Sequence, residues 1–215
     1  MPKITAYPLD YQYAGFSFNW LPFDLPNDTG HYTQTGAGSA TLGSGKITIS
    51  CSTGQDKFYE SPSMGSGVPV TIRTRLKPVA QGSLAGGRGF EFRSGTYWGA
   101  VYVNVDGLAL YDIHASAQIG SAGSFGANSE IDILFAMDDA NVYLWQLVAS
   151  KNEKQWILIA NGSLSAGGGI ANSRIRFGVI NSLALGGGAT LDTEWYEFHY
   201  AFDTAVGDGL FVGQT

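Results

Sequence analysis

The stretch Glu130–Val148, EIDILFAMDDANVYLWQLV, constrains the fold of this chain more than any other segment. In its first half Ile131, Ile133 and Phe135 fall on one face, and the residues between them fall on the other. The second half alternates in the same way, and a period of two with β-branched and aromatic side chains indicates strands. The polar segment MDDAN between the halves favours a turn. Because both faces are rich in apolar residues, we expect a hairpin that lies deep in a β-sandwich.

Runs with the same period recur along the chain and predict an all-β, antiparallel two-sheet β-sandwich. We expect about a dozen strands at the spacing typical of sandwiches, among them residues 46–52, 68–77, 90–93, 97–105, 108–114, 155–160, 174–180 and 191–202. Within 68–77 the alternation predicts one apolar face and one solvated face that carries Arg73, Arg75 and Lys77.

Three other segments lead to structural expectations. Residues 33–41 and 115–128 are small and polar, so we expect them to be loops. In the last strand Trp195 and Tyr196 mark opposite faces, and we expect Phe198 and Tyr200 to continue one face each.

Composition supports one domain and narrows the classes of partner. The chain has 215 residues, of which 30 are Gly, which suits many short strands joined by tight turns. We expect a lead-in over residues 1–13, a β-sandwich over 14–203 and a tail over 204–215. A net charge of -6 without a basic run argues against nucleic acid or anionic membrane as a partner. No apolar run is long enough for insertion into a membrane.

The single cysteine, Cys51, excludes an internal disulfide and is expected to be a buried strand thiol. No secretory signal is visible, so we expect synthesis in the cytoplasm, with a virion or extracellular surface as the final location.

The order of strands and turns resembles a known fold. The aromatic stretch FSFNWLPFDLPNDTGHYTQT is followed by LGSGKITIS, VTIRTRLKP, FEFRSG, the hairpin VYVNVDGLALY, NVYLWQLV, IRFGV and EWYEFHYAF. This resembles the concanavalin A-like jelly roll of lectins, laminin G-like modules and some glucanases, over about residues 14–203. The resemblance implies two stacked antiparallel sheets, with ligands bound on the concave sheet or on loops at its rim. Such modules also occur on bacteriophage tail and fibre proteins.

One half of a glucanase motif is present. Glucanases of the laminarinase type carry a Glu-x-Asp-x-x-Glu strand, and Glu130 and Asp132 match its first two positions. Phe135 stands where the second carboxylate should be, so the acid/base partner of a retaining mechanism is missing. We therefore assign no catalytic residue and favour a non-catalytic protein, with a degenerate glycoside hydrolase as one alternative.

The aromatic residues offer a second reading, in which flat rings stack on the apolar faces of sugars. Trp98 is the best candidate, because it follows a turn and precedes Gly99, where backbone could approach a ligand closely. Several arginines lie nearby in the sequence and could bond hydroxyls or an acidic sugar. The ligand-binding candidates are Trp98, Tyr97, Arg73, Arg75 and Arg93.

We expect no cofactor and no metal ligand set. Structural calcium is a weaker alternative, because Asp106 or the group Asp138, Asp139 and Asn141 supplies oxygen ligands in segments that also read as ordinary turns. The three histidines are dispersed without zinc-site spacing.

These observations lead to a function hypothesis and its alternative. The first is a lectin-like module that binds a glycan or cell-surface polysaccharide, carried on a phage particle or another surface assembly. The second is a structural or oligomerisation domain of a virion protein, in which apolar residues of the tail would contact a neighbouring subunit.

Overall fold

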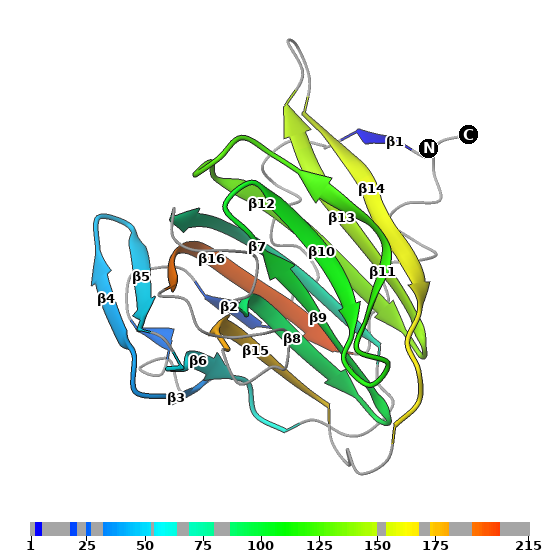
Figure 1. The fold of residues 1–215 in the computed structure, drawn as a ribbon, viewed down its shortest axis with the longest axis horizontal. Coiled ribbons are helices and arrows are strands. Elements are labelled where there is room, and N and C mark those ends of the chain that lie inside the picture. Colours follow the sequence, from blue (N-terminus) through cyan, green and yellow to red (C-terminus); the bar gives the residue numbers. More distant parts are fainter. Residues whose placement is uncertain are drawn as a thin grey trace.

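A computed structural model of the chain describes residues 3–5, 18–20, 25–26, 32–52, 54–63, 69–79, 87–149, 154–167, 173–180 and 191–202. Within these ranges the chain forms sixteen strands in two antiparallel sheets, which confirms the predicted sandwich. Figure 1 shows the two layers, with β8 to β11 lying over β7, β12 and β16. No helix in these ranges is long and apolar enough to cross a membrane.

The larger sheet has nine strands. In spatial order they are β1 (Lys3–Thr5), β14 (Lys154–Ser163), β13 (Asn141–Ala149), β12 (Ile131–Asp138), β7 (Val70–Val79), β16 (Leu191–Phe202), β5 (Lys46–Cys51) and β4 (Ser39–Gly43), with β2 (Phe18–Trp20) beside β16. The smaller sheet has seven strands. They are β11 (Ala117–Ser124), β10 (Gly107–Asp112), β9 (Tyr97–Val103), β8 (Arg88–Ser94), β15 (Arg174–Val179), β6 (Lys57–Glu60) and β3 (Thr33–Thr35).

Aromatic side chains join the two sheets in the core. Phe92 of the seven-stranded sheet lies 4.0 Å from Phe135 of the nine-stranded sheet, measured between ring centroids. Phe177 stacks on Phe198 at 4.2 Å across the same interface. All four residues are buried, and each alternates with outward-facing residues on its strand. The alternation in the sequence therefore sets the face that each strand contributes to the core.

The hairpin at Glu130–Val148 forms as predicted. β12 and β13 pair from Ile133 with Gln146 to Asp138 with Asn141. Asp139 in the turn has a φ of 52°, the left-handed conformation that Asp tolerates. Ile133 and Phe135 face the main core, whereas Leu134 and Ala136 belong to a second buried apolar cluster on the outer face, with Trp145 and Trp156. Both faces of the hairpin are therefore buried.

The strand at residues 191–202 departs from its predicted alternation. Its pairing with β7 shifts between Trp195 and Glu197, so that Tyr196 is an extra residue in a β-bulge. Trp195, Phe198 and Tyr200 are all buried in the core as a result. The expectation that Phe198 and Tyr200 face opposite ways is wrong, because residues two apart share a face of a strand. The bulge places Trp195 on that same face.

The solvated cationic face predicted for β7 is wrong at its first positions, whereas Lys77 at the far end keeps 33% of its side chain exposed. Thr71 is 0% exposed and Arg73 is 7% exposed, although both lie on the outer face. Arg73 pairs there with Asp132 at 3.5 Å and with Glu197 at 3.2 Å. The neighbouring strands therefore supply the carboxylates that balance the charge on this face.

Two segments expected to be loops contain strands. β3 and β4 lie within residues 33–41 and their flank, and β11 covers 117–124. β4 and β11 are edge strands whose Ser, Gly and Ala side chains are mostly exposed. They lack the apolar alternation that reveals a strand, because neither of their faces is fully buried.

Arg88 is a buried cation between the sheets, 1% exposed. Its guanidinium donates to three backbone carbonyls: Val103 on β9 at 3.0 Å, Val79 on β7 at 2.7 Å and Asp192 on β16 at 3.1 Å. Burial lowers the pKa of Arg88 to about 10, opposed by the charge of Asp192. Arg88 therefore ties the end of β8 to strands of both sheets.

Cys51 is buried, as the sequence predicts, with 1% of its surface exposed. Burial, together with Asp56, raises the pKa of its thiol to about 11. The thiol is therefore a packing group on the inner face of β5.

Candidate functional site

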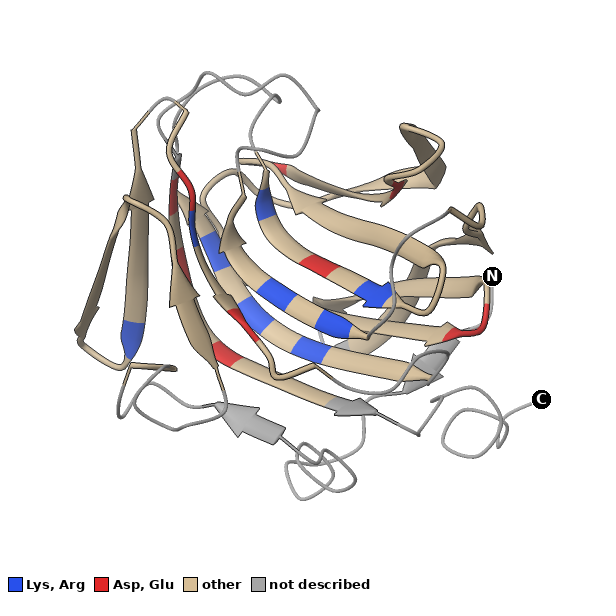
Figure 2. Cartoon of the chain, turned by 90° about the horizontal axis from the view of Figure 1, so that it is seen from below, with Lys and Arg blue, Asp and Glu red and all other residues tan. Residues whose placement is uncertain are grey.

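The candidate site lies on the outer face of the seven-stranded sheet. Inner positions of β8, β9 and β15 carry Phe92, Val101 and Phe177, so the positions between them point outward. Figure 2 shows basic and acidic positions next to one another on the central strands. We call the outward-facing group the Trp98 face; it consists of Phe58, Glu60, Glu91, Arg93, Trp98, Tyr102, Arg174 and Arg176.

Glu91 is at the centre of the Trp98 face and is 1% exposed. Its Oε1 accepts from Nε of Arg93 at 2.7 Å and lies 2.7 Å from Nη2 of the same residue. Nη1 of Arg176 lies 3.6 Å from the same oxygen. Both cations thus approach the same oxygen of Glu91, Oε1.

Glu60 holds the opposite side of the face. Its Oε1 accepts from Nη1 of Arg174 at 2.9 Å, and its Oε2 accepts a short bond from Nε of Arg176. The guanidinium carbon of Arg176 also lies 5.0 Å from the centroid of the Phe58 ring. Arg176 therefore bridges the two carboxylates across β6, β15 and β8.

The aromatic part of the site is built around Trp98, which is half-buried. The guanidinium carbon of Arg93 lies 4.1 Å from the centroid of the indole ring, a cation–π contact. The ring of His114 meets the indole edge-on at 5.8 Å. Trp98 and Tyr102 also pack against a buried pair, Phe58 and Ile180. These contacts hold the indole in one orientation and leave one side of it open to solvent.

Four buried polar atoms around the Trp98 face have no hydrogen-bond partner among the described residues: Glu91 Oε2, Trp98 Nε1, Tyr102 Oη and His114 Nε2. Trp98 lowers the pKa of Glu91 through a hydrogen bond that lacks normal geometry. Buried polar groups are nearly always paired in native proteins, because an unpaired group loses its hydration without compensation. This concentration of open donors and acceptors distinguishes the face from ordinary sheet surface.

Burial sets the electrostatics of the central carboxylate. It raises the pKa of Glu91, and the nearby Arg93 and Arg176 partly oppose this shift. Burial also raises the pKa of Tyr102, and the charge of Glu91 adds to that shift. Tyr102 is therefore a neutral hydroxyl, able to donate or accept, beside a carboxylate.

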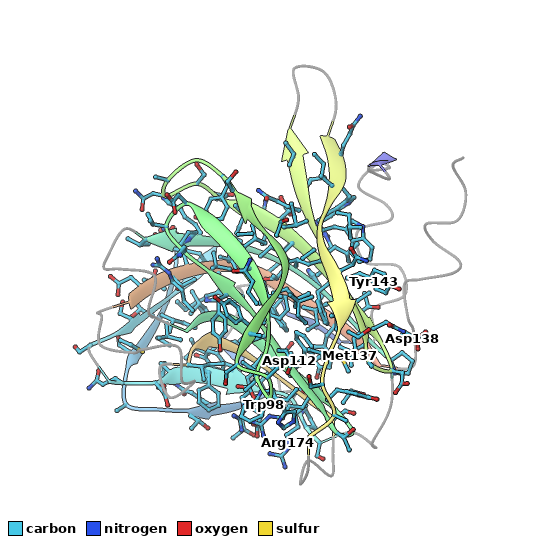
Figure 3. All side chains as sticks on the ribbon, turned by 45° about the vertical axis from the view of Figure 1, so that its right-hand side comes forward. Trp98, Asp112, Met137, Asp138, Tyr143 and Arg174 are labelled. Carbon is cyan, nitrogen blue, oxygen red and sulfur yellow. The ribbon has the colours of Figure 1, made fainter. Side chains whose placement is uncertain are left out.

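Asp112 holds the loops beside Trp98. Its Oδ1 accepts from the backbone N–H of Ala115 at 3.1 Å, and its Oδ2 accepts from that of Ser165 at 2.7 Å. Burial raises the pKa of Asp112, but these bonds outweigh it and the pKa is lowered overall. Figure 3 shows Asp112 close to Trp98 and Arg174, with Tyr143 elsewhere on the molecule.

The structure brings only two of the five predicted binding residues together on the Trp98 face. Arg93 and Trp98 are direct cross-strand partners and lie on the Trp98 face together. Tyr97, by contrast, points inward and packs against the main core. Arg73 and Arg75 lie on β7, in the other sheet, so the expectation that they share a region with Trp98 is wrong. Alternation shows which residues share a face of one strand, and it does not show which sheet the strand joins.

Gly99 has a packing role. A Cβ at this position would lie 2.5 Å from the ring of Phe92 and 3.1 Å from Leu164. Gly99 therefore admits core side chains, and the close approach inferred from the sequence occurs on the side away from the candidate site.

Three charged residues of the Trp98 face were not predicted as site residues: Glu60, Glu91 and Arg176. Their signal was present in the stretches KFYE, RGFEFR and RIRFGV, where charged residues alternate with aromatic and aliphatic ones. Only the order of strands in the sheet shows that the three stretches are neighbours.

The half-motif of the glucanases lies on the nine-stranded sheet. Asp132 pairs with Arg73, and Phe135 is 0% exposed in the core. Among the described residues no group of three or more His, Cys, Asp or Glu side chains is arranged to hold a metal ion. Asn141, one of the calcium candidates, accepts from the Ser163 hydroxyl at 3.1 Å.

Comparison with known proteins identifies the fold. No protein-family model and no curated protein matches the sequence. Among solved structures, the potassium-bound form of the Emp46p carbohydrate recognition domain matches with a TM-score of 0.55 at 12% identity, over 85% of this chain and 93% of that one. The metal-free form matches with a TM-score of 0.52 at 11% identity, over 86% of this chain and 93% of that one.

A structure of botulinum neurotoxin type C matches with a TM-score of 0.51 at 11% identity, over 81% of this chain and 44% of that one. At these identities the likeness concerns the fold. The two antiparallel sheets and these matches confirm that the chain folds as a concanavalin A-like jelly roll.

Proposed function

We propose that this chain is a non-catalytic carbohydrate-binding module that holds a glycan on the Trp98 face. The observation that carries the proposal is the half-buried indole of Trp98, which Arg93 and His114 hold in place beside the partly exposed guanidinium groups of the same face. The shared fold adds support, because the matched domain of Emp46p is a carbohydrate recognition domain.

The chemistry of the face suits a sugar. A pyranose presents apolar C–H groups that pack on an indole, and hydroxyls that need both donors and acceptors. Trp98 supplies the ring, and the partly exposed guanidinium groups of Arg93 and Arg174 supply donors. The contacts of Arg93 and His114 hold the indole in place before a ligand arrives, which lowers the entropic cost of binding.

A glycan array followed by isothermal titration calorimetry tests the proposal. We expect Trp98→Ala to weaken binding of the best array ligand by at least about tenfold, in the range of one aromatic contact. Tyr143→Ala is the matched control, because Tyr143 stacks on Trp145 at the outer face of the other sheet. Circular dichroism establishes that both variants are folded. Absence of binding to every saccharide, or equal loss in the two variants, contradicts the proposal.

We also propose that the module works on a surface assembly such as a phage particle. Support comes from composition: charged residues make up 14% of the chain, Gly is abundant, and the one cysteine is buried. Sedimentation velocity tests whether the chain self-associates, as a subunit of such an assembly would, and a strict monomer at high concentration counts against this setting.

A further inference from the structure

Two arginines of the Trp98 face lie directly opposite each other. Arg93 on β8 and Arg174 on β15 are cross-strand partners in the antiparallel register. Partners in such pairs have Cβ atoms about 4.5–5.5 Å apart, and like charges placed this way destabilise a sheet. Each arginine turns to its own carboxylate, Arg93 to Glu91 and Arg174 to Glu60. An anion between the two guanidinium groups would remove the remaining repulsion.

The charges of the face do not balance. The ion pairs connect three guanidinium groups, those of Arg93, Arg174 and Arg176, with only two carboxylates. The third cation therefore has no carboxylate of its own within this network. Arg174 is the most accessible of the three, with 39% of its side chain exposed against 21% for the other two.

Arg174 also keeps most of its hydrogen-bonding capacity. A guanidinium carries five N–H donors, and the described residues receive one bond from Arg174, at Glu60 Oε1. Guanidinium groups bind carboxylates through two parallel N–H···O bonds, a geometry that a neutral hydroxyl cannot match.

We propose that the ligand is an acidic glycan, whose sugar carboxylate sits against Arg174 and Arg93 while the sugar body packs beside Trp98. This inference rests on the proposed function and adds the class of sugar. The net charge of -6 on the chain does not oppose it, because charges beyond a Debye length of about 8 Å are largely screened at physiological ionic strength. The local excess of one positive charge decides the preference.

Calorimetry with matched pairs of saccharides tests the inference. Each pair consists of a carboxylate-bearing sugar and its neutral counterpart: 3′-sialyllactose with lactose, and trigalacturonic acid with its carboxyl-reduced trisaccharide. We expect at least one acidic member to bind about tenfold more tightly than its counterpart, a preference that declines as NaCl is raised. Arg174→Gln should reduce this preference to below about threefold, because the acidic member loses a paired contact to its carboxylate and the neutral member loses only single hydrogen bonds.

Two further variants make the test specific. Glu60→Gln removes the carboxylate that competes for Arg174, so it should strengthen binding of the acidic sugar. Arg75→Gln makes the same change in charge on the other sheet and should leave the preference as it is. The two variants therefore have different expected results, stronger binding for Glu60→Gln and no change for Arg75→Gln. Because Arg174 is partly exposed, we expect Arg174→Gln to fold.

The outcomes distinguish failure of the acidic-glycan inference from failure of glycan binding itself. Equal binding of acidic and neutral members, or an unchanged preference in Arg174→Gln, overturns the acidic class and leaves glycan binding intact. Stronger binding of sulfated than of carboxylated sugars also overturns the carboxylate assignment. No binding to any saccharide overturns the proposed function together with this inference.

Discussion

Removal of Arg88 should strongly destabilise the fold. It is buried and donates to three backbone carbonyls in two sheets. Arg88→Met would leave those carbonyls without a donor, and each unsatisfied buried group costs about 1–3 kcal/mol. We expect the free energy of unfolding to fall by about 3–5 kcal/mol, measured by urea denaturation with tryptophan fluorescence.

The control for Arg88 is Arg174→Met, which removes the same group from a side chain that is 39% exposed. An exposed ion pair contributes about 0–1 kcal/mol, so this variant should stay near the stability of the wild type. Similar losses in the two variants would show that Arg88 does not tie the sheets together.

Glu91 should give the protein a characteristic dependence on pH. Burial raises the pKa of Glu91 above its ordinary value of 4.5, opposed in part by Arg93 and Arg176. Between the ordinary and the raised value the native state binds more protons than the unfolded state, so stability falls as pH rises through that window. We expect the wild type to lose stability relative to Glu91→Gln as the pH rises from the ordinary pKa of 4.5 through the raised one, measured by urea denaturation.

Glu194 should give stability the opposite dependence on pH. Burial raises its pKa, but the hydrogen bonds from Lys46 and Tyr196 outweigh this, so that the pKa is lowered. Its contribution is present above the ordinary value of 4.5 and is lost as pH falls through the lowered pKa. If Glu91→Gln and Glu194→Gln gave the same trend with pH, the burial of Glu91 would not control its charge.

At the level of single residues the sequence predicted Trp98 and Arg93 as neighbours and misplaced Arg73 and Arg75. Trp98 and Arg93 flank one tight turn, so their proximity follows from local pairing of β8 with β9. Arg73 lies on β7, which pairs with β12 and β16. Such long-range pairing depends on the packing of the whole sandwich, and no local pattern specifies it.

Among the strands, β16 depends most on a single irregularity. The bulge at Tyr196 places Trp195, Phe198 and Tyr200 on the same inner face. Deleting Tyr196 would restore regular alternation and turn either Trp195 or the pair Phe198 and Tyr200 away from the core. We expect the deletion variant to be unfolded, with no dispersion in its amide NMR spectrum.

Tyr196→Ala separates the backbone role of this position from its side chain. The substitution keeps the extra residue and removes only the hydroxyl that donates to Glu194 and the ring beneath Arg75. A folded Tyr196→Ala with a dispersed spectrum is expected. A folded deletion variant would show that β16 can change its register without loss of the core.

The strands that could be predicted share one property, an apolar set of alternating residues on at least one face. β7, β9, β12 and β13 have it and were predicted close to their observed bounds. β4 and β11 are edge strands with mostly exposed small residues, so their sequences show no apolar alternation. The bulge in β16 was equally invisible, because its extra residue is an ordinary tyrosine.

For the molecule as a whole, distant pairing should set the speed of folding. β1 near the start pairs with β14, and β7 pairs with β16 along most of its length. All-β sandwiches with such pairings fold in milliseconds to seconds, because loop closure precedes the stabilising contacts. We expect refolding on the order of a second, followed by stopped-flow fluorescence of the buried tryptophans. Interrupted unfolding separates this phase from proline isomerisation, and refolding in microseconds would contradict the expectation.

The buried thiol of Cys51 has a practical consequence for attaching probes. With a pKa of about 11, about one molecule in 10⁴ carries a thiolate at neutral pH, and the sulfur is also shielded. Leu42, 36% exposed on the edge strand β4, belongs to the sheet opposite the Trp98 face. Leu42→Cys should therefore take up one maleimide dye per chain, visible as a single mass increment. The native cysteine can stay in place, and the labelled protein can be immobilised with its Trp98 face free.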